Sequence, residues 1–184
     1  MIAIVVFIVL SILIYIFMYN SLVAKRNQVK NAFASIDTLL KKRYDLIPNL
    51  VNTVKQYMEH ENETLTKIAQ LRSRAVESSN IDEQAEIDSQ MSGLMKSLMV
   101  QVENYPNLKA NENFLKLQSS LNNIEGQIAA ARRAYNAAVT NYNTSIQVFP
   151  NSVIASMANF TPFKLFEIPE KERQNVDVGN IFNS

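Results

Sequence analysis

The first 19 residues are predominantly apolar and carry no charged side chain, and this run constrains the chain more than any other feature. As a helix rising about 1.5 Å per residue it would span roughly 28 Å, close to the ~30 Å hydrocarbon core of a bilayer. It has neither the basic start nor the small-residue cleavage site of a signal peptide. We therefore predict an uncleaved transmembrane anchor over residues 1–20 rather than a buried core helix, with these anchoring positions: Ile2, Ile4, Phe7, Leu10, Leu13, Ile16 and Tyr19.

The charges that follow the anchor predict its orientation. Lys25, Arg26 and Lys30 come soon after it, and a basic cluster follows at residues 41–43. Basic residues that flank a membrane helix tend to stay in the cytoplasm. The expected topology is a single pass through the lipid bilayer, with the N-terminus outside and the remainder of the chain in the cytoplasm.

The rest of the sequence has the pattern of long helices joined by few turns. The whole chain contains only 3 Gly and 5 Pro, whereas sandwiches, barrels and Rossmann-type sheets need many tight turns. Apolar residues step by three and four along four segments, most regularly over residues 111–149. These patterns predict an all-α fold, in which the transmembrane helix continues into an elongated, antiparallel, coiled-coil-like four-helix bundle over residues 21–150. A short apolar and aromatic segment and a flexible tail are expected over residues 151–184.

The end of the first helix is expected just before Pro48. In this interpretation the helix that begins in the anchor ends near residue 44, and Asp45 is the N-cap of the next helix. Pro48 then lies in a first helical turn, where its missing N–H costs nothing. The alternative is a single helix that contains the proline as a kink.

Few residues could support enzyme chemistry. The chain has no Cys and a single His, which removes thiolate sites and leaves almost no capacity for zinc. Glu59 and Glu63 share one helical face and His60 lies on another, so a solvated helix tip is favoured over the metal site of a hydrolase. No phosphate-binding glycine loop or nucleophile elbow is present, and a net charge of +1 gives no general attraction to nucleic acid. We expect no enzymatic activity, no cofactor, no metal and no nucleic-acid partner.

Several polar residues interrupt the apolar stripes or flank a boundary, and they are candidates for fixing helix register or a contact between subunits. A charge on such a stripe is costly unless it is paired. For the basic cluster at 41–43 a solvated face is favoured over a patch that binds lipid headgroups. Residues 20–58 hold seven basic and two acidic side chains, and residues 59–103 hold four basic and nine acidic ones, so the two stretches are complementary. The candidates are Arg26, Asp37, Arg43, Asp45, Pro48, Arg132, Tyr135 and Tyr142.

A Tyr-Asn pair occurs twice at a seven-residue spacing, at 135–136 and at 142–143. This spacing places both pairs on one helical face, which permits a ladder of hydrogen bonds between helices. The favoured interpretation is that both tyrosines are core residues whose hydroxyls reach the surface. Farther along, Phe160, Phe163 and Phe166 form an aromatic cluster that is a candidate docking element for a partner protein.

Motifs spread along nearly the whole chain resemble the signature of the LemA family. The most specific is Lys-Lys-Arg-Tyr-Asp-Leu-Ile-Pro-Asn-Leu-Val over residues 41–51, followed by Tyr-Pro-Asn-Leu-Lys-Ala over 105–110 and by the two Tyr-Asn pairs. Three positions depart from the family pattern. Phe33 stands where the family usually has Trp, Asn159 stands where Gly is common, and Leu165 replaces the first Phe of a Phe-Phe-Glu end.

The resemblance implies a bacterial single-pass protein of the inner membrane, with an elongated helical bundle and no established enzymatic activity. Some LemA-like proteins are associated with membrane remodelling or magnetosome membranes, and others with membrane proteases of the HtpX type. Our leading hypothesis is a membrane-anchored scaffold that homo-oligomerises at the membrane surface and acts in membrane organisation or remodelling. The alternative is an adaptor or regulator of an HtpX-like membrane protease in envelope quality control, docked through the aromatic cluster.

Overall fold

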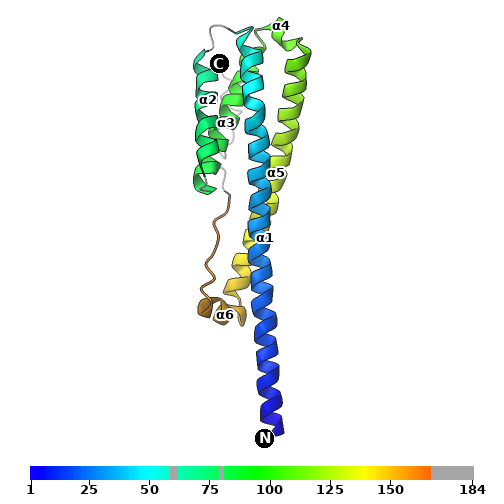
Figure 1. Cartoon of the computed structure of the whole chain (residues 1–184), viewed down its shortest axis with the longest axis vertical. Coiled ribbons are helices and arrows are strands. Elements are labelled where there is room, and N and C mark those ends of the chain that lie inside the picture. Colours follow the sequence, from blue (N-terminus) through cyan, green and yellow to red (C-terminus); the bar gives the residue numbers. More distant parts are fainter. Residues whose placement is uncertain (59–61, 79–80, 167–184) are drawn as a thin grey trace, which may run out of the picture. The chain divides into compact units, whose positions relative to one another are not determined.

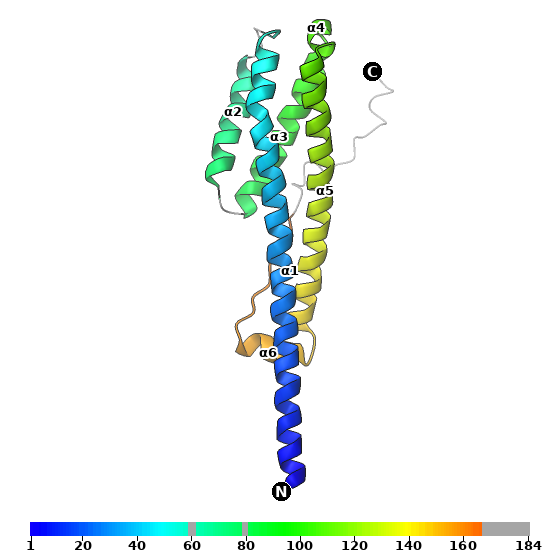
Figure 2. The same ribbon diagram turned by 45° about the vertical axis from the view of Figure 1, so that its right-hand side comes forward.

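The computed structural model describes residues 1–58, 62–78 and 81–166, and all regular structure in these ranges is helical (Figure 1; Figure 2). The helices are α1 (Ile2–Lys55), α2 (Asn62–Glu77), α3 (Ile81–Val102), α4 (Pro106–Lys109), α5 (Glu112–Gln147) and α6 (Asn151–Met157). The all-α prediction, with four long helices and a short one after Pro150, is confirmed for this part of the chain.

The chain packs as two compact units, and α1 and α5 contribute residues to both. Of the described residues, unit 1 comprises Met1–Leu39 and Glu125–Leu165, and unit 2 comprises Phe166 and those within Leu40–Ile124. Helix length explains this division, because α2 and α3 have 16 and 22 residues whereas α1 and α5 have 54 and 36. Unit 2 therefore contains four helical segments of comparable length, and unit 1 contains two long ones.

Unit 2 is an antiparallel four-helix bundle whose core comes from the apolar stripes. Its successive long segments run in opposite directions (Figure 1). Asn111 caps α5 by accepting a hydrogen bond from the backbone N–H of Phe114 at 3.0 Å. The predicted bundle of heptad helices is present in this unit, with these buried core members: Leu40, Ile47, Leu50, Val54, Leu65, Ile68, Ile87, Met91, Leu98, Phe114 and Leu121.

α1 runs through Pro48 without ending, so the predicted helix end near residue 44 is wrong. Asp45 is an exposed residue inside the helix rather than an N-cap. Pro48 has no N–H to donate to the carbonyl of Tyr44, four residues earlier. Arg72 on α2 donates its Nε–H to this carbonyl at 3.0 Å. A side chain from a neighbouring helix thus supplies the donor that the proline lacks, which explains how α1 accommodates Pro48.

Replacing Arg72 by methionine is expected to lower the free energy of unfolding by about 1–3 kcal/mol, because the carbonyl of buried Tyr44 loses a hydrogen-bond donor. In a Pro48→Ala background the new N–H of residue 48 can donate to the same carbonyl. Arg72→Met should therefore lower the free energy of unfolding measurably less in that background. Denaturation of the four proteins in detergent measures this coupling. Equal costs in both backgrounds would contradict the role assigned to Arg72.

Unit 1 pairs the first part of α1 with the second part of α5 in antiparallel orientation (Figure 2). The Phe33 ring lies 6.0 Å from that of Tyr135, and the Nζ of Lys25 donates to the Oδ1 of Asn141 at 3.0 Å. Two helices alone leave one side of their shared apolar stripe open, so a further element has to cover it. The buried members of this stripe are Leu22, Val29, Ile36, Ile128, Tyr135, Val139 and Tyr142.

α6 ends in a turn that explains the departure from the family pattern at residue 159. Asn159 has a φ of 53°, in the left-handed region that Gly adopts most easily and Asn tolerates. The N–H of Phe160 donates to the carbonyl of Ala155 at 2.9 Å, and the N–H of Asn159 donates to that of Ser156 at 3.4 Å. This is the Schellman arrangement of a helix C-terminus. Asn159 can therefore replace the usual Gly without changing the turn.

Candidate functional site

The N-terminal part of α1 presents its apolar side chains to the outside. Its most apolar 18-residue window has a mean hydropathy of 3.0, and none of that window is buried. Within the described part of the chain, α1 is the one helix that is long and apolar enough to cross a membrane. Such exposure is costly in water and favourable in lipid. The structure leaves these predicted anchor residues available for a bilayer: Ile2, Ile4, Phe7, Leu10, Leu13, Ile16 and Tyr19.

Aromatic rings gather where this exposed run ends. Tyr15 and Tyr19 stack with their ring centroids 6.4 Å apart, and the Phe160 ring meets Tyr19 edge-on at 5.8 Å. Tyrosines are enriched at membrane–water interfaces because the ring is apolar and the hydroxyl is polar. The guanidinium of Arg26, about two turns farther along α1, lies 5.8 Å from the centre of the Phe160 ring.

Residues 160–165, which we call the C-terminal strap, cover the open side of the helix pair in unit 1. Asn143 binds the strap twice: its Nδ2 donates to the carbonyl of Phe163 at 2.8 Å, and its Oδ1 accepts from the N–H of Phe163 at 3.0 Å. The hydroxyl of Tyr142 donates to the carbonyl of Thr161 at 3.1 Å. The hydroxyl of Tyr135 donates to the carbonyl of Lys164 at 3.0 Å.

These contacts resolve the two interpretations of the repeated Tyr-Asn pair. Both tyrosine rings are core members, as the favoured interpretation expected, with 1% of their surface exposed. Their hydroxyls do not reach the surface, because backbone carbonyls of the strap accept their protons. A ladder of hydrogen bonds exists, but it joins α5 to an extended segment rather than to another helix. The strap has no helical period, so the sequence pattern did not reveal it as the partner.

Burial raises the pKa of the Tyr142 hydroxyl above its ordinary value of 10.0, and the nearby charge of Arg26 opposes this shift. Folded Tyr142 holds its proton more tightly than unfolded Tyr142, so its contribution to stability is complete below pH 10 and is lost as the pH rises through the folded pKa. The stability difference between the wild type and Tyr142→Phe should therefore shrink above pH 10. Denaturation as a function of pH measures it, with Tyr105→Phe as the control. A difference that does not change with pH would contradict this assignment.

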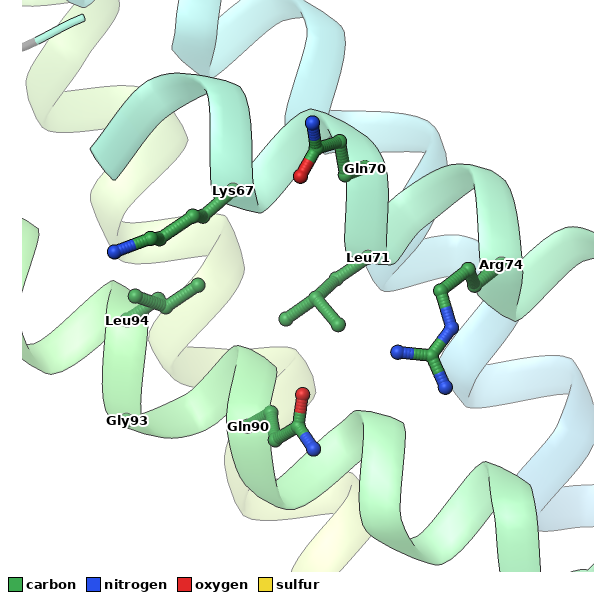
Figure 3. Close-up of a pocket in the computed structure, with 7 residues that line it drawn as sticks. All are labelled: Lys67, Gln70, Leu71, Arg74, Gln90, Gly93 and Leu94. Carbon is green, nitrogen blue, oxygen red and sulfur yellow. The ribbon is translucent and has the colours of Figure 1, made fainter. Parts of the chain in front are cut away.

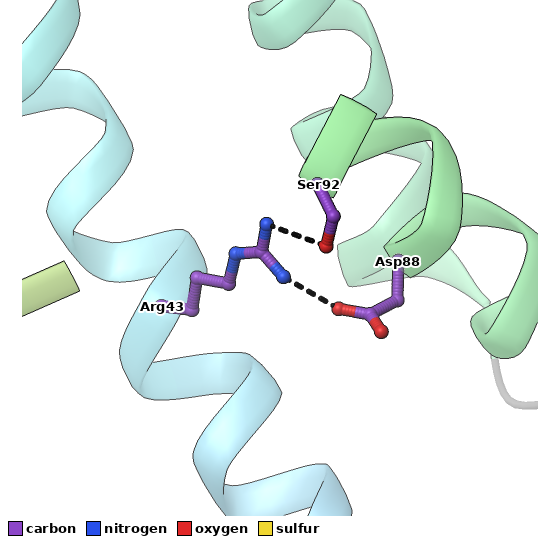
Figure 4. Close-up of polar contacts among 3 residues, drawn as sticks. All are labelled: Arg43, Asp88 and Ser92. Atoms are coloured by element: carbon purple, nitrogen blue, oxygen red, sulfur yellow. Dashed lines mark hydrogen bonds and ion pairs between the residues drawn. The ribbon is translucent and has the colours of Figure 1, made fainter. Parts of the chain in front are cut away.

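Arg43, one of the candidates for fixing helix register, forms a buried ion pair with α3 in unit 2 (Figure 4). The Nη1 of Arg43 lies 2.7 Å from the Oδ1 of Asp88 on α3, with 3% and 0% of the side chains exposed. The Nη2 of Arg43 donates to the Oγ of Ser92 at 3.1 Å. The prediction that the basic cluster at 41–43 is a solvated face is therefore wrong for Arg43, although Lys41 and Lys42 are exposed.

Asp88 was not among the predicted site residues, yet the sequence contains a signal for it. Counting back from Val102 in alternating steps of four and three gives Leu98, Met95, Met91 and then Asp88. A carboxylate in a heptad seam needs a partner of opposite charge or several hydrogen-bond donors. Arg43 occupies the equivalent step between Leu40 and Ile47 on α1. The two seam charges could have been matched on these grounds.

The other predicted site residues are distributed over the surface and the helix pair. Asp37 is exposed on α1, and Arg132 is half-buried on α5. Arg26 is exposed and contacts Phe160 as described above. Phe160 and Phe163 are half-buried and pack against Tyr142, with ring centroids 6.5 and 5.2 Å from it. Phe166 is buried, with 4% of its surface exposed.

An open pocket of about 560 Å³ lies between α2 and α3 in unit 2 (Figure 3). Lys67 lines it and is paired with Glu63 at 2.6 Å, which lowers the pKa of that carboxyl, and Arg74 lies 3.9 Å from Glu83. The remaining lining residues are Gln70, Leu71, Gln90, Gly93 and Leu94. The lining contains no Ser, Thr, Tyr or His side chain.

The metal candidate lies outside the described ranges, which omit residues 59–61. That segment includes His60 and its neighbours Glu59 and Glu61. Among the residues that are described, no three or more His, Asp or Glu side chains gather closely enough to hold a metal ion.

Comparison with known proteins assigns the chain to a family. The family model described as LemA family matches residues 32–179. The chain is 32% identical to Protein LemA of Metamycoplasma hominis over 96% of its own length and 83% of that protein. It is 23% identical to Magnetosome protein MamQ 1 of Paramagnetospirillum magneticum and 22% identical to Magnetosome protein MamQ of Magnetospirillum gryphiswaldense. Each of these two matches spans 64% of the magnetosome protein and about four fifths of this chain. The chain belongs to the LemA family.

Proposed function

We propose that this protein is a single-pass, membrane-anchored helical scaffold of the bacterial inner membrane that assembles with copies of itself. The observation that carries the proposal is the exposed, uncharged first third of α1, which continues within one helix into the packed helix pair of unit 1. An anchor joined to a helical pair in this way holds the pair at the membrane surface. Lys25, Arg26 and Lys30 follow the anchor and favour a cytoplasmic position for the segment after it.

Confinement to the plane of the membrane supports self-association, because it raises the effective concentration of the copies. The long heptad stripes are not available for this purpose, since their residues are buried within the chain. Assembly is therefore expected through exposed apolar side chains of unit 2, namely Val76 on α2, Val100 on α3 and Leu115 on α5. The similarity to magnetosome proteins supports a role for such an assembly in membrane organisation or remodelling.

The proposed function is non-enzymatic, because binding and assembly need only the surfaces described above. The alternative, an adaptor of a membrane protease, assigns docking to Phe160, Phe163 and Phe166. In the structure Phe160 and Phe163 pack on Tyr142, and Phe166 is buried. Docking through these rings would require the strap to leave α5, so the geometry favours the scaffold.

The absence of cysteine makes single-cysteine variants a direct test of assembly and orientation. Val76→Cys, Val100→Cys and Leu115→Cys each place one thiol at an exposed site of unit 2. Oxidation in native membranes should link copies of the full chain through at least one of these thiols. A membrane-impermeant maleimide should label them only after the cytoplasmic side is opened. If none of the variants forms linked copies and light scattering of the solubilised chain gives a monomer, the scaffold proposal fails.

A further inference from the structure

α6 and the turn before it present a second apolar surface in unit 1. Phe149, Val153 and Met157 have 83%, 52% and 71% of their surface exposed. Val153 and Met157 are four residues apart and therefore share one face of α6. The other side of the helix is packed, with Ile154 and Ala155 buried. α6 is thus amphipathic in its packing, with one face toward the protein and an apolar face that no described residue covers.

The contacts of Phe160 place this surface beside the end of the anchor. Phe160 directly follows the C-terminal turn of α6, and its ring meets Tyr19 at 5.8 Å and Tyr142 at 6.5 Å. α6 lies next to α1 in both views, and the N-terminal part of α1 extends beyond it (Figure 1; Figure 2). The exposed apolar run of α1 ends at about Tyr19. The apolar face of α6 therefore begins where the apolar surface of the anchor stops.

The charged residues of unit 1 are absent from the stretches that would enter the bilayer and begin where the lipid headgroups would lie. No charged residue occurs from 134 to 163, a stretch that includes α6, and none occurs on α1 before Lys25. The first cations, Lys25 and Arg26, follow Tyr19 by six and seven residues, or about 9–10 Å along the helix. Lys25 is held by Asn141 and Ser145 of α5, and Arg26 lies over Phe160. These cations lie at the level that lipid headgroups would occupy if residues 2–19 cross the hydrocarbon core.

We propose that α6 and the preceding turn form an in-plane membrane foot, with Phe149, Val153 and Met157 inserted at the boundary between headgroups and acyl chains. The occupant of this face is the same bilayer that holds the anchor, so the inference rests on the proposed anchoring of α1. Short amphipathic segments of this kind lie with the apolar face about 5–10 Å into the interface. The foot gives the protein two attachment points and thereby fixes the tilt and rotation of unit 1 relative to the membrane.

The absence of tryptophan allows a single reporter to test the foot in the full chain. Val153→Trp and Met157→Trp report on the foot, Phe17→Trp reports on the anchor, and Ala34→Trp is the control. Ala34 is exposed on α1, fifteen residues or about 22 Å beyond Tyr19. Each variant is reconstituted in phosphatidylcholine vesicles containing lipids brominated at a shallow or a deep acyl position.

The expected result is a blue-shifted emission for the two foot variants, quenched more by shallow than by deep bromines, with no quenching of the Ala34→Trp protein. If Phe17→Trp is quenched and neither foot variant is, the foot is wrong and the anchor stands. If Phe17→Trp also escapes quenching, the anchoring itself fails. The foot variants could instead show a blue-shifted emission that brominated lipid does not quench and that disappears at a high lipid-to-protein ratio. This result would assign the apolar face to a contact with a second copy of the chain and overturn the proposal.

Discussion

Asp88→Ala is expected to lower the free energy of unfolding of unit 2 by about 3–5 kcal/mol, the largest single effect we anticipate. The substitution leaves the Arg43 guanidinium in a site where 3% of the side chain is exposed, without the carboxylate that lies 2.7 Å away. A buried cation that loses its counter-ion keeps its desolvation penalty and loses the attraction that offsets it. Chemical denaturation of the detergent-solubilised chain measures the change.

The pair Glu103 and Lys109 is the matched control, because it is also an ion pair but has more than half of each side chain exposed. Solvent screens such a pair, so Glu103→Ala should cost no more than about 1 kcal/mol. Comparable losses for Asp88→Ala and Glu103→Ala would contradict the view that burial makes the Arg43–Asp88 pair decisive.

The double variant Arg43→Met, Asp88→Leu separates stability from specificity. Apolar residues of similar volume restore packing and remove both desolvation penalties, so the double variant should be far more stable than Asp88→Ala alone. The pair then has a different role, which is to fix register. Sliding α3 by one heptad along α1 would move Asp88 by roughly 10 Å and bury both charges apart from each other. The wild type excludes this alternative, whereas the double variant would not.

The seven-residue spacing of apolar side chains predicted the features that depend on residues close together in the sequence, namely helices and their buried faces. The long helical segments and most core positions follow from apolar residues at steps of three and four, because that period places them on one helical face. The short helix after Pro150 was expected from an apolar stretch alone. The same count reaches Asp88, so the buried ion pair was within reach of sequence reasoning. The same spacing identifies Tyr135 and Tyr142 as core members, and both are buried.

Features that depend on contacts between distant residues were not predictable in this way. Nothing near Pro48 shows that Arg72 donates to the Tyr44 carbonyl, and the local preference for ending a helix before proline led to the wrong boundary. The apolar residues of the strap recur at no regular spacing. The strap is held by side chains of α5 that bind its backbone. Backbone binding is largely independent of the sequence of the bound segment, so its residues give little indication of it.

Asn143→Leu is expected to release the strap, because one amide side chain satisfies both the N–H and the carbonyl of Phe163 at 3.0 and 2.8 Å. Leucine is similar in volume and can make neither bond, so the local stability of the strap should fall by about 2–4 kcal/mol. Amide exchange in the strap, residues 160–165, should then accelerate by roughly 30- to 1,000-fold, since each 1.4 kcal/mol is tenfold in an opening equilibrium.

Thr140→Leu on the same helix is the control, since Thr140 is exposed and lies one turn away. It should leave exchange in the strap unchanged. Asn143→Asp keeps the acceptor for the N–H of Phe163 and loses the donor to its carbonyl, so its effect should lie between those of the other two variants. If Asn143→Leu exchanges like the wild type, then the rings of Phe160 and Phe163 on Tyr142, rather than the amide of Asn143, are what hold the strap on α5.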